Sequence, residues 1–108
     1  MIPVKIKENS WVAKIAAYKL KSKNCAIVFC RTIHLYNITK KEILTNRRLL
    51  NHELKHVQQW EEYGKIRFVY FYFLYSIKYG YHQNPFEIEA RDNENNFQIV
   101  NDFLLPEN

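Results

Sequence analysis

The sequence predicts an α+β fold that is mostly helical and carries a small sheet. Apolar residues recur at helical spacing along much of the chain, and two short segments are rich in β-branched and aromatic residues. Only two glycines and three prolines interrupt the 108 residues, and 47% of the chain is hydrophobic. This is enough apolar material for one core, so we expect a single domain over residues 1–108.

The N-terminal part predicts one helix and then one or two strands. Residues 10–22 begin at Ser10, a good N-cap, and place apolar side chains at helical spacing. Residues 25–30 and 32–38 favour strands. Because Arg31 leaves little room for a tight hairpin, a single bent strand is an alternative to two paired strands.

A second helical region follows over residues 40–63. Thr39 precedes it and Glu42 follows three positions later, which is the pattern of a capping box. The helix can break near residues 45–46. Gly64 marks its end, because glycine is favoured just beyond the last turn of a helix.

The remaining chain predicts two more helices. Residues 65–80 form an aromatic helix, which we expect to pack under the preceding helix and to supply most of the core. Asn84-Pro85 indicates a turn and a helix start, because proline suits the first helical position. The last helix is expected to run from Pro85 to Phe103, with a core stripe formed by Phe86, Ala90, Phe97 and Val100.

The sequence favours a reducing compartment. The N-terminus has charges scattered through it and lacks the pattern of a signal peptide. Residues 68–77 are the most apolar run, and ten residues are about half of what a membrane-spanning helix needs. In a strand, Cys25 and Cys30 would point to opposite faces and could not pair. We therefore expect no transmembrane segment and a cytoplasmic location.

Charge is distributed unevenly along the chain. Residues 1–48 carry eleven Lys/Arg and two Asp/Glu, whereas residues 49–108 carry five and nine. A basic surface attracts nucleic acid or acidic lipid non-specifically, but no nucleic-acid-binding motif accompanies it. We interpret the lysines as a solvated face and do not expect nucleic acid as a partner.

His52-Glu53-Leu54-Lys55-His56 forms an H-E-x-x-H motif inside the predicted helix. Histidines four residues apart lie about 40° and one turn apart on a helix, so both can bind one ion. Glu53 can reach a water at that ion and accept its proton. On the helical wheel both histidines lie away from the main apolar stripe, as ligands beside a cleft should.

A catalytic zinc ion needs a third protein ligand, and a carboxylate is a common one. Glu87 and Glu89 stand at the start of the last predicted helix, about thirty residues after the motif. Residues two apart on a helix point in different directions, so only one of them can face the metal. The helical wheel gives Glu87 a small advantage, because it lies nearer to Ala90 on the core stripe.

NHELKHVQQW followed by NPFEIEAR resembles the gluzincin metallopeptidases, in which a Glu on a later helix completes the H-E-x-x-H site. In several branches that Glu opens an E-x-x-A-[D/N] pattern. The chain most resembles short bacterial proteins of uncharacterised role with an H-E-L-x-H-x-x-Q core, over roughly residues 32–100. The resemblance implies zinc ligation by His52, His56 and Glu87, with Glu53 as the general base.

One position departs from the gluzincin pattern. Arg91 follows Ala90, where those branches usually place an Asp or Asn that orients a histidine. Either another residue takes that role, or the match of Glu87 to the third ligand is shifted.

Other polar residues are candidates for further roles. Tyr81 and His82 precede the turn and are candidates for stabilising an oxyanion, although the chain contains eight tyrosines. We interpret His34 as a surface residue of its strand. Gln58 and Gln59 are expected to cap or solvate the helix.

Together these features predict a zinc-dependent peptidase in which a metal-activated water attacks a peptide bond and Glu53 accepts its proton. A zinc-stabilised binding or regulatory module without catalysis is the alternative, because 108 residues leave little chain for a substrate cleft. A basic nucleic-acid-binding protein is a third possibility. Other divalent metals suit the same ligands. The expected partners are a peptide or protein substrate and, through exposed aromatic residues of the 65–80 helix, a second copy of the chain.

Overall fold

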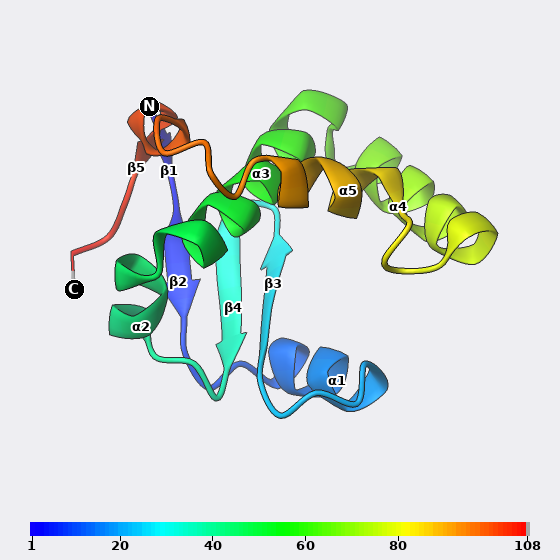
Figure 1. Ribbon diagram of the computed structural model, residues 1–108, viewed down its shortest axis with the longest axis horizontal. Helices are drawn as coiled ribbons and strands as arrows, with labels where there is room; N and C mark the ends of the chain where they lie inside the picture. The colour runs from blue at the N-terminus through cyan, green and yellow to red at the C-terminus, as the bar shows by residue number, and fades with distance from the viewer. Residues whose placement is uncertain (108) are drawn as a thin grey trace.

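The computed structural model describes residues 1–107 and has the predicted α+β fold (Figure 1). The helices are α1 (Trp11–Lys19), α2 (Lys40–Thr45), α3 (Arg47–Tyr63), α4 (Lys65–Tyr79) and α5 (Pro85–Asp92), followed by the 3-10 helix η1 (Ile99–Asp102). The strands are β1 (Ile2–Pro3), β2 (Lys5–Lys7), β3 (Cys25–Phe29), β4 (Thr32–Tyr36) and β5 (Phe103–Leu104). Short strands at both chain ends were not predicted from the sequence.

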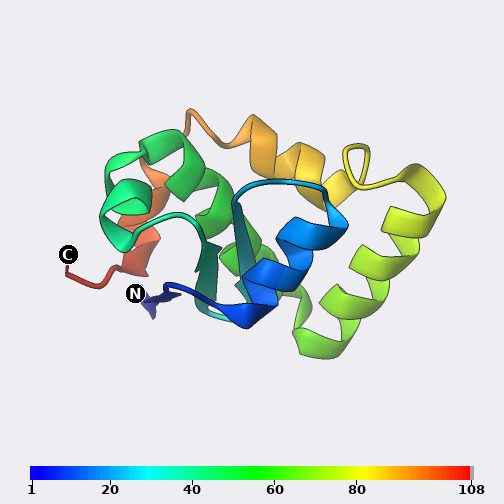
Figure 2. The same cartoon turned by 90° about the horizontal axis from the view of Figure 1, so that it is seen from below.

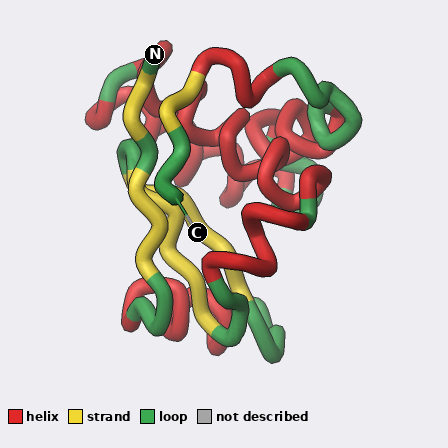
Figure 3. Tube along the Cα trace, turned by 90° about the vertical axis from the view of Figure 1, so that its left-hand side faces the viewer, coloured by secondary structure: helices red, strands yellow, loops and turns green. Residues whose placement is uncertain are grey.

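The three-stranded sheet has the order β2-β4-β3. Its centre is β4, which pairs in parallel with β2 and in antiparallel with β3. Near the other end of the chain, β5 pairs in parallel with β1, and the two terminal segments run side by side (Figure 3). As a result β3 lies at an edge of the sheet, and it is this edge strand that packs against α3.

The β3–β4 segment is a hairpin rather than one bent strand. Phe29 pairs with Thr32, so Cys30 and Arg31 together form a two-residue turn. Cys30 adopts a φ of 58°, the left-handed conformation that tight hairpin turns require at their first central position. The turn is possible because two residues, not Arg31 alone, connect the strands. Cys25 and Cys30 are both free thiols.

The helical region over residues 40–63 is broken where the sequence indicated. Thr39 and Glu42 form the predicted capping box at the start of α2. Asn46 interrupts the helix, and its side-chain oxygen accepts a hydrogen bond from the Leu49 backbone N–H at 3.2 Å, which caps α3. Gly64 then ends α3 with a φ of 79°, a conformation that glycine adopts without strain.

The last helix is shorter than predicted. It begins at Pro85, as expected, but ends at Asp92 instead of Phe103. Four of residues 92–96 (DNENN) are Asp or Asn, whose short side chains compete for backbone hydrogen bonds and so favour turns over helix. Phe97 therefore lies outside the helix and is half exposed, while Phe86 and Ala90 are buried as predicted.

The core is built mainly by α3 and β4 and not by the aromatic helix α4. Its most completely buried apolar side chains on these two elements are Ile33, Leu35, Leu50, Leu54 and Val57. On α4 only Phe68 is buried, because the helix packs mainly on α3 and leaves its other side uncovered by the described residues. The prediction that α4 supplies most of the core was therefore wrong.

Helix α3 is the element around which the site is assembled. It packs against α2, α4, α5 and β3, while α1 packs against β3 and β4 (Figure 2). This arrangement brings the N-terminal turn of α5 alongside the middle of α3, where the H-E-x-x-H motif lies. Within residues 1–107, none of the helices has the length and apolar character needed to cross a membrane.

Candidate metal centre

His52, His56 and Glu87 form a group that could hold a metal ion. The two imidazoles lie one turn apart on α3, with ring centroids 5.0 Å apart. Glu87 Oε1 is 3.2 Å from His52 Nε2 and 3.1 Å from His56 Nε2. All three donor atoms lie within 4.8 Å of one another, so the structure brings together the three residues predicted as ligands.

The start of α5 is fixed in a way that presents Glu87 to the histidines. The fully buried Asn84 donates hydrogen bonds to the Tyr72 carbonyl and to Ser76 Oγ, at 3.0 and 2.9 Å. Its side-chain oxygen also accepts from the Phe86 backbone N–H, which caps the helix. Glu87 consequently stands in the first turn of α5, where the helix dipole favours a carboxylate.

Two of the three donor-atom distances in this group fit a tetrahedral ion. Zinc binds histidine nitrogens and carboxylate oxygens at about 2.0–2.2 Å, which places neighbouring ligand atoms about 3.3 Å apart. The two distances from Glu87 Oε1 to the imidazole nitrogens match that separation. Two imidazoles and one carboxylate are also the donor set of a catalytic zinc site, although other divalent metals accept it.

Glu89, the rival third ligand, points elsewhere. Its Oε1 accepts a hydrogen bond from Gln59 Nε2 at 2.9 Å, and the residue is exposed. Glu87, in contrast, is buried against both imidazoles. Of the two carboxylates at the start of α5, the structure places only Glu87 in the group.

Gln59 sets the orientation of His56. Its Nε2 donates to the Phe86 carbonyl and to Glu89, so its Oε1 faces His56 Nδ1 at 2.8 Å and accepts a hydrogen bond from it. Because Nδ1 carries a proton and contacts Gln59, Nε2 is the ring nitrogen that faces Glu87. The prediction that Gln59 caps or solvates the helix was wrong, because the residue is only 1% exposed. Gln58 behaves as a surface residue and donates to Asp102.

Glu94 sets the orientation of His52 in the same manner. Its Oε2 accepts from His52 Nδ1 at 2.9 Å. Arg48 holds the other carboxylate oxygen, and Asn51 Nδ2 donates to the Glu94 carbonyl at 3.0 Å. Glu94 thus fills the orienting role that Arg91 cannot take. Arg91 instead donates to the His82 carbonyl.

Tyr72 of α4 holds the other side of Glu87. Its hydroxyl donates to Glu87 Oε2, so that Oε1 is left for the two imidazoles. Burial would raise the pKa of Glu87, but hydrogen bonds from His52, His56 and Tyr72 hold it well below its usual range. Burial and the Glu87 charge raise the pKa of Tyr72, which keeps it protonated as a donor. Glu87 is therefore an anion at neutral pH.

Glu53 lies between the histidines and is 4% exposed. Burial raises the pKa of its carboxyl to about 7, against the opposing charges of His56 and His52. A group with such a pKa can exchange a proton near neutral pH, which a general base needs. It lines the cleft that also contains the three candidate ligands.

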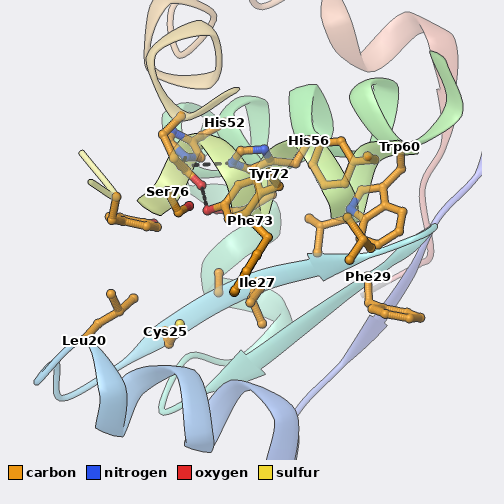
Figure 4. Close-up of a pocket in the computed structure, with 17 residues that line it drawn as sticks. Leu20, Cys25, Ile27, Phe29, His52, His56, Trp60, Tyr72, Phe73 and Ser76 are labelled. Carbon is orange, nitrogen blue, oxygen red and sulfur yellow. Dashed lines mark hydrogen bonds and ion pairs between the residues drawn. The ribbon is translucent and has the colours of Figure 1, made fainter. Parts of the chain in front are cut away.

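That cleft has a volume of about 350 Å³ and lies between the edge strand β3 and helices α3 and α4 (Figure 4). His52, Glu53, His56 and Glu87 are among its polar residues, together with Tyr72, Ser76 and Tyr81. Its walls are mostly apolar and include Leu20, Ile27, Phe29, Trp60, Phe68 and Phe73. Cys25 also lines it, and burial together with the charges of Glu53 and Glu87 raises the pKa of this thiol to about 11. The arrangement joins a candidate metal group to an apolar binding surface.

Of the remaining polar candidates, Tyr81 lines the cleft, whereas His82 and His34 do not. Tyr81 lines the cleft, and burial followed by the charges of Glu87 and Glu53 raises its pKa, so its hydroxyl remains a donor. His82 is exposed and contacts the ring of Tyr81 without lining the cleft. His34 lies on β4 with its Nδ1 2.8 Å from Ser10 Oγ, outside the metal group, in agreement with its interpretation as a strand residue.

Comparisons with protein-family models, curated proteins and solved structures found no match to this chain. The gluzincin resemblance of the two motif segments therefore stays a prediction.

Replacing Gln59 by leucine is expected to weaken zinc binding by about 10- to 100-fold, the usual cost of losing a partner that orients a ligating histidine. His56 would lose the acceptor that keeps its proton on Nδ1. Competition with a chromophoric chelator measures the affinity. Gln58→Leu is the matched control, and equal affinities for the two variants would contradict the orienting role.

Zinc affinity is expected to rise with pH between about 7 and 9. Burial alone would lower the pKa of His52, but Glu87, Glu53 and Glu94 raise it to about 9, and the pKa of His56 is also raised. A protonated imidazole must release its proton to bind a cation, so each such proton adds about tenfold in affinity per pH unit. Titrations at pH 6.5, 7.5 and 8.5 measure the slope. An affinity independent of pH would contradict these protonation states.

The same shift predicts how the zinc-free protein responds to pH. A pKa raised from 6.5 to about 9 means that the ion pairs of His52 stabilise the fold fully below about pH 6.5. That stabilisation is lost as the pH rises toward 9. Thermal unfolding without zinc should therefore give a Tm that falls over this range, whereas a Tm that rises would contradict the pairing.

Proposed function

We propose that the protein is a zinc-dependent peptidase, with His52, His56 and Glu87 as ligands and Glu53 as general base. One observation carries the proposal: three donor atoms converge within 4.8 Å in a cleft, beside a buried carboxylate whose pKa lies near 7. The likeness of the H-E-x-x-H and E-x-x-A segments to gluzincins supports the same assignment.

A zinc ion bound here would polarise a substrate carbonyl and lower the pKa of an attacking water toward about 7. Glu53 would accept the proton of that water as the oxygen adds to the carbonyl carbon. It would return the proton to the leaving nitrogen as the peptide bond breaks, so that the carboxylate is regenerated. Gln59 and Glu94 hold the two imidazoles, and Tyr72 holds the distal oxygen of Glu87, so the ligand atoms stay in place during the reaction.

The surroundings of the site favour an extended peptide as substrate. Strand β3 lies at the edge of the sheet and lines the cleft, and an edge strand offers unpaired backbone groups to an added strand. The cleft walls are apolar, with Ile27, Trp60 and Phe73 among them. Both features support a substrate that contributes an extended backbone and an apolar side chain.

Elemental analysis and a cleavage assay test the proposal together. Wild-type protein is expected to bind one zinc ion and His56→Ala none, while His82→Ala, which alters an exposed histidine outside the cleft, keeps the ion. Zinc-loaded wild type should cleave a fluorescently labelled unfolded protein, and a chelator should stop it. Equal zinc in wild type and His56→Ala would refute the ligand assignment. Zinc binding without cleavage would leave the non-catalytic binding module as the function.

A further inference from the structure

Helix α4 carries an exposed apolar stripe that no part of the described chain covers. Its members recur at spacings of three and four residues, so they lie on one face of the helix. Each side chain is between 41% and 86% exposed, and the stripe consists of Ile66, Val69, Tyr70, Phe73, Leu74 and Ile77. An apolar surface of this extent usually marks a binding site.

Helix α1 presents a second exposed apolar face. Trp11, Ile15 and Tyr18 follow one another at spacings of four and three, and all three are more than half exposed. Only Ala13 and Ala17 of this helix are buried, on the side that packs on the sheet. Leu20, directly after α1, is also exposed.

The α4 stripe and the residue directly after α1 both border the candidate active-site cleft. Leu20 lines the cleft from the α1 side and Phe73 lines it from the α4 side (Figure 4). Val69 of α4 also lines it. All three side chains are exposed as well. The mouth of the cleft is therefore bordered by the α4 stripe on one side and by Leu20, at the C-terminal end of α1, on the other.

The two chain segments that contain α1 and α4 carry basic charges alone. These segments, residues 9–41 and 63–86, contain no Asp or Glu. Within these two segments the exposed charged side chains on and beside the helices are those of Lys14, Lys19, Lys21, Lys23, Lys65, Arg67 and Lys78, while the exposed Glu8, Glu61 and Glu62 lie just before the segments. The acidic residues of the chain lie on other segments, so a surface with negative charge would meet attraction on this side of the cleft.

We propose that α1 and α4 dock the protein onto an anionic phospholipid surface, with the mouth of the cleft facing the lipid. The exposed apolar side chains would enter the boundary between headgroups and acyl chains, and the lysines would contact lipid phosphates. Tryptophan and tyrosine suit this boundary, because each has an apolar ring and a polar tip. Helix α4 has 15 residues and is about 22 Å long, too short to span a bilayer, so it lies in the plane of the surface.

The charges argue against a second copy of the chain as the occupant of the stripe. Pairing two α4 helices would bring Lys65, Arg67 and Lys78 of each copy close to those of the other, whether the helices run parallel or antiparallel. No acidic residue on α4 could offset that repulsion. Nucleic acid would meet the basic groups but leave Ile66 and Ile77 in water, since these side chains offer it no hydrogen bonds.

Vesicle co-sedimentation tests the proposal. Wild-type protein, with or without zinc, is expected to bind vesicles of phosphatidylcholine and phosphatidylglycerol in equal parts and to bind pure phosphatidylcholine much more weakly. Ile66→Gln and Ile77→Gln should each weaken binding about tenfold, because each removes one buried aliphatic side chain. Lys19→Gln should weaken it about fivefold. Leu104→Gln, which alters an exposed leucine on β5, is the matched control and should bind as wild type.

Three outcomes would overturn the docking proposal. One is the absence of binding to the anionic vesicles at low salt. Another is equal binding by Ile66→Gln and Leu104→Gln. The third is a lipid-free dimer that Ile66→Gln separates into monomers, which would assign the stripe to a second copy. The docking does not depend on the metal chemistry, so Glu53→Gln should bind vesicles as wild type does, and a failure of either proposal can be recognised separately.

Discussion

A Glu53→Gln protein is expected to keep its zinc and to hydrolyse peptide bonds about 10²- to 10⁴-fold more slowly than wild type, the usual contribution of a general base. Glutamine has nearly the same shape as glutamate but cannot accept the proton. Glu53 lies outside the three-donor group, so its loss should leave metal binding intact. Initial rates of cleavage and zinc content, measured on the same samples, check both parts.

Glu62→Gln is the matched control for this variant, because Glu62 is an exposed residue on the same helix. It should retain the wild-type rate. If Glu53→Gln cleaves as fast as Glu62→Gln, the general base is another group and the proposed mechanism is wrong.

A Glu87→Ala protein is expected to bind zinc at least 100-fold more weakly than wild type. The variant loses the only carboxylate within reach of both imidazoles among the described residues, and loss of a direct ligand costs more than loss of an orienting partner. Zinc at a hundredfold excess over the wild-type Kd should stabilise wild type by about 2.7 kcal/mol and this variant by about 0.4 kcal/mol at most. Thermal unfolding with and without zinc measures the difference.

Glu89→Ala is the comparison that decides between the two carboxylates of α5. Glu89 contacts Gln59, which keeps its second hydrogen bond to the Phe86 carbonyl, so His56 should stay oriented. We therefore expect zinc to stabilise Glu89→Ala nearly as much as wild type. Zinc stabilisation that survives in Glu87→Ala and is lost in Glu89→Ala would reverse the assignment.

The convergence of the three site residues could be predicted because each depends on local rules. Helical periodicity places His52 and His56 on one face, and Asn84-Pro85 begins a new helix, which puts Glu87 in its first turn. A reversal of the chain between these two helices is enough to bring Glu87 near the histidines.

The residues that support the site could not be predicted in the same way. Glu94 reaches His52 only because α5 ends at Asp92 and the chain turns back toward α3. Tyr72 is one of eight tyrosines, and no local pattern distinguishes it from the others. On the helical wheel Gln59 lies beside His56, which indicated a contact between the two side chains. Burial of the Gln59 amide, however, depends on α5, which the wheel does not show.

The fold shows the same division between local and distant determinants. Caps and periodicity predicted α2, α3 and α4 closely, with the break at Asn46. Strands β1, β2 and β5 were missed because each has only two or three residues and forms through pairing with a distant segment, such as Ile2 with Phe103. The alternation of Ile2, Val4 and Ile6 is present in the sequence, but so short a run does not distinguish a strand from a loop.

A crystal structure of the zinc-loaded protein, with anomalous data collected at the zinc absorption edge, tests the central claim most directly. We predict one anomalous peak within about 2.2 Å of His52 Nε2, His56 Nε2 and Glu87 Oε1, with Glu53 beside it in the cleft. An anomalous peak at other residues, or zinc-loaded crystals with none between these three side chains, would contradict the metal centre and with it the proposed peptidase.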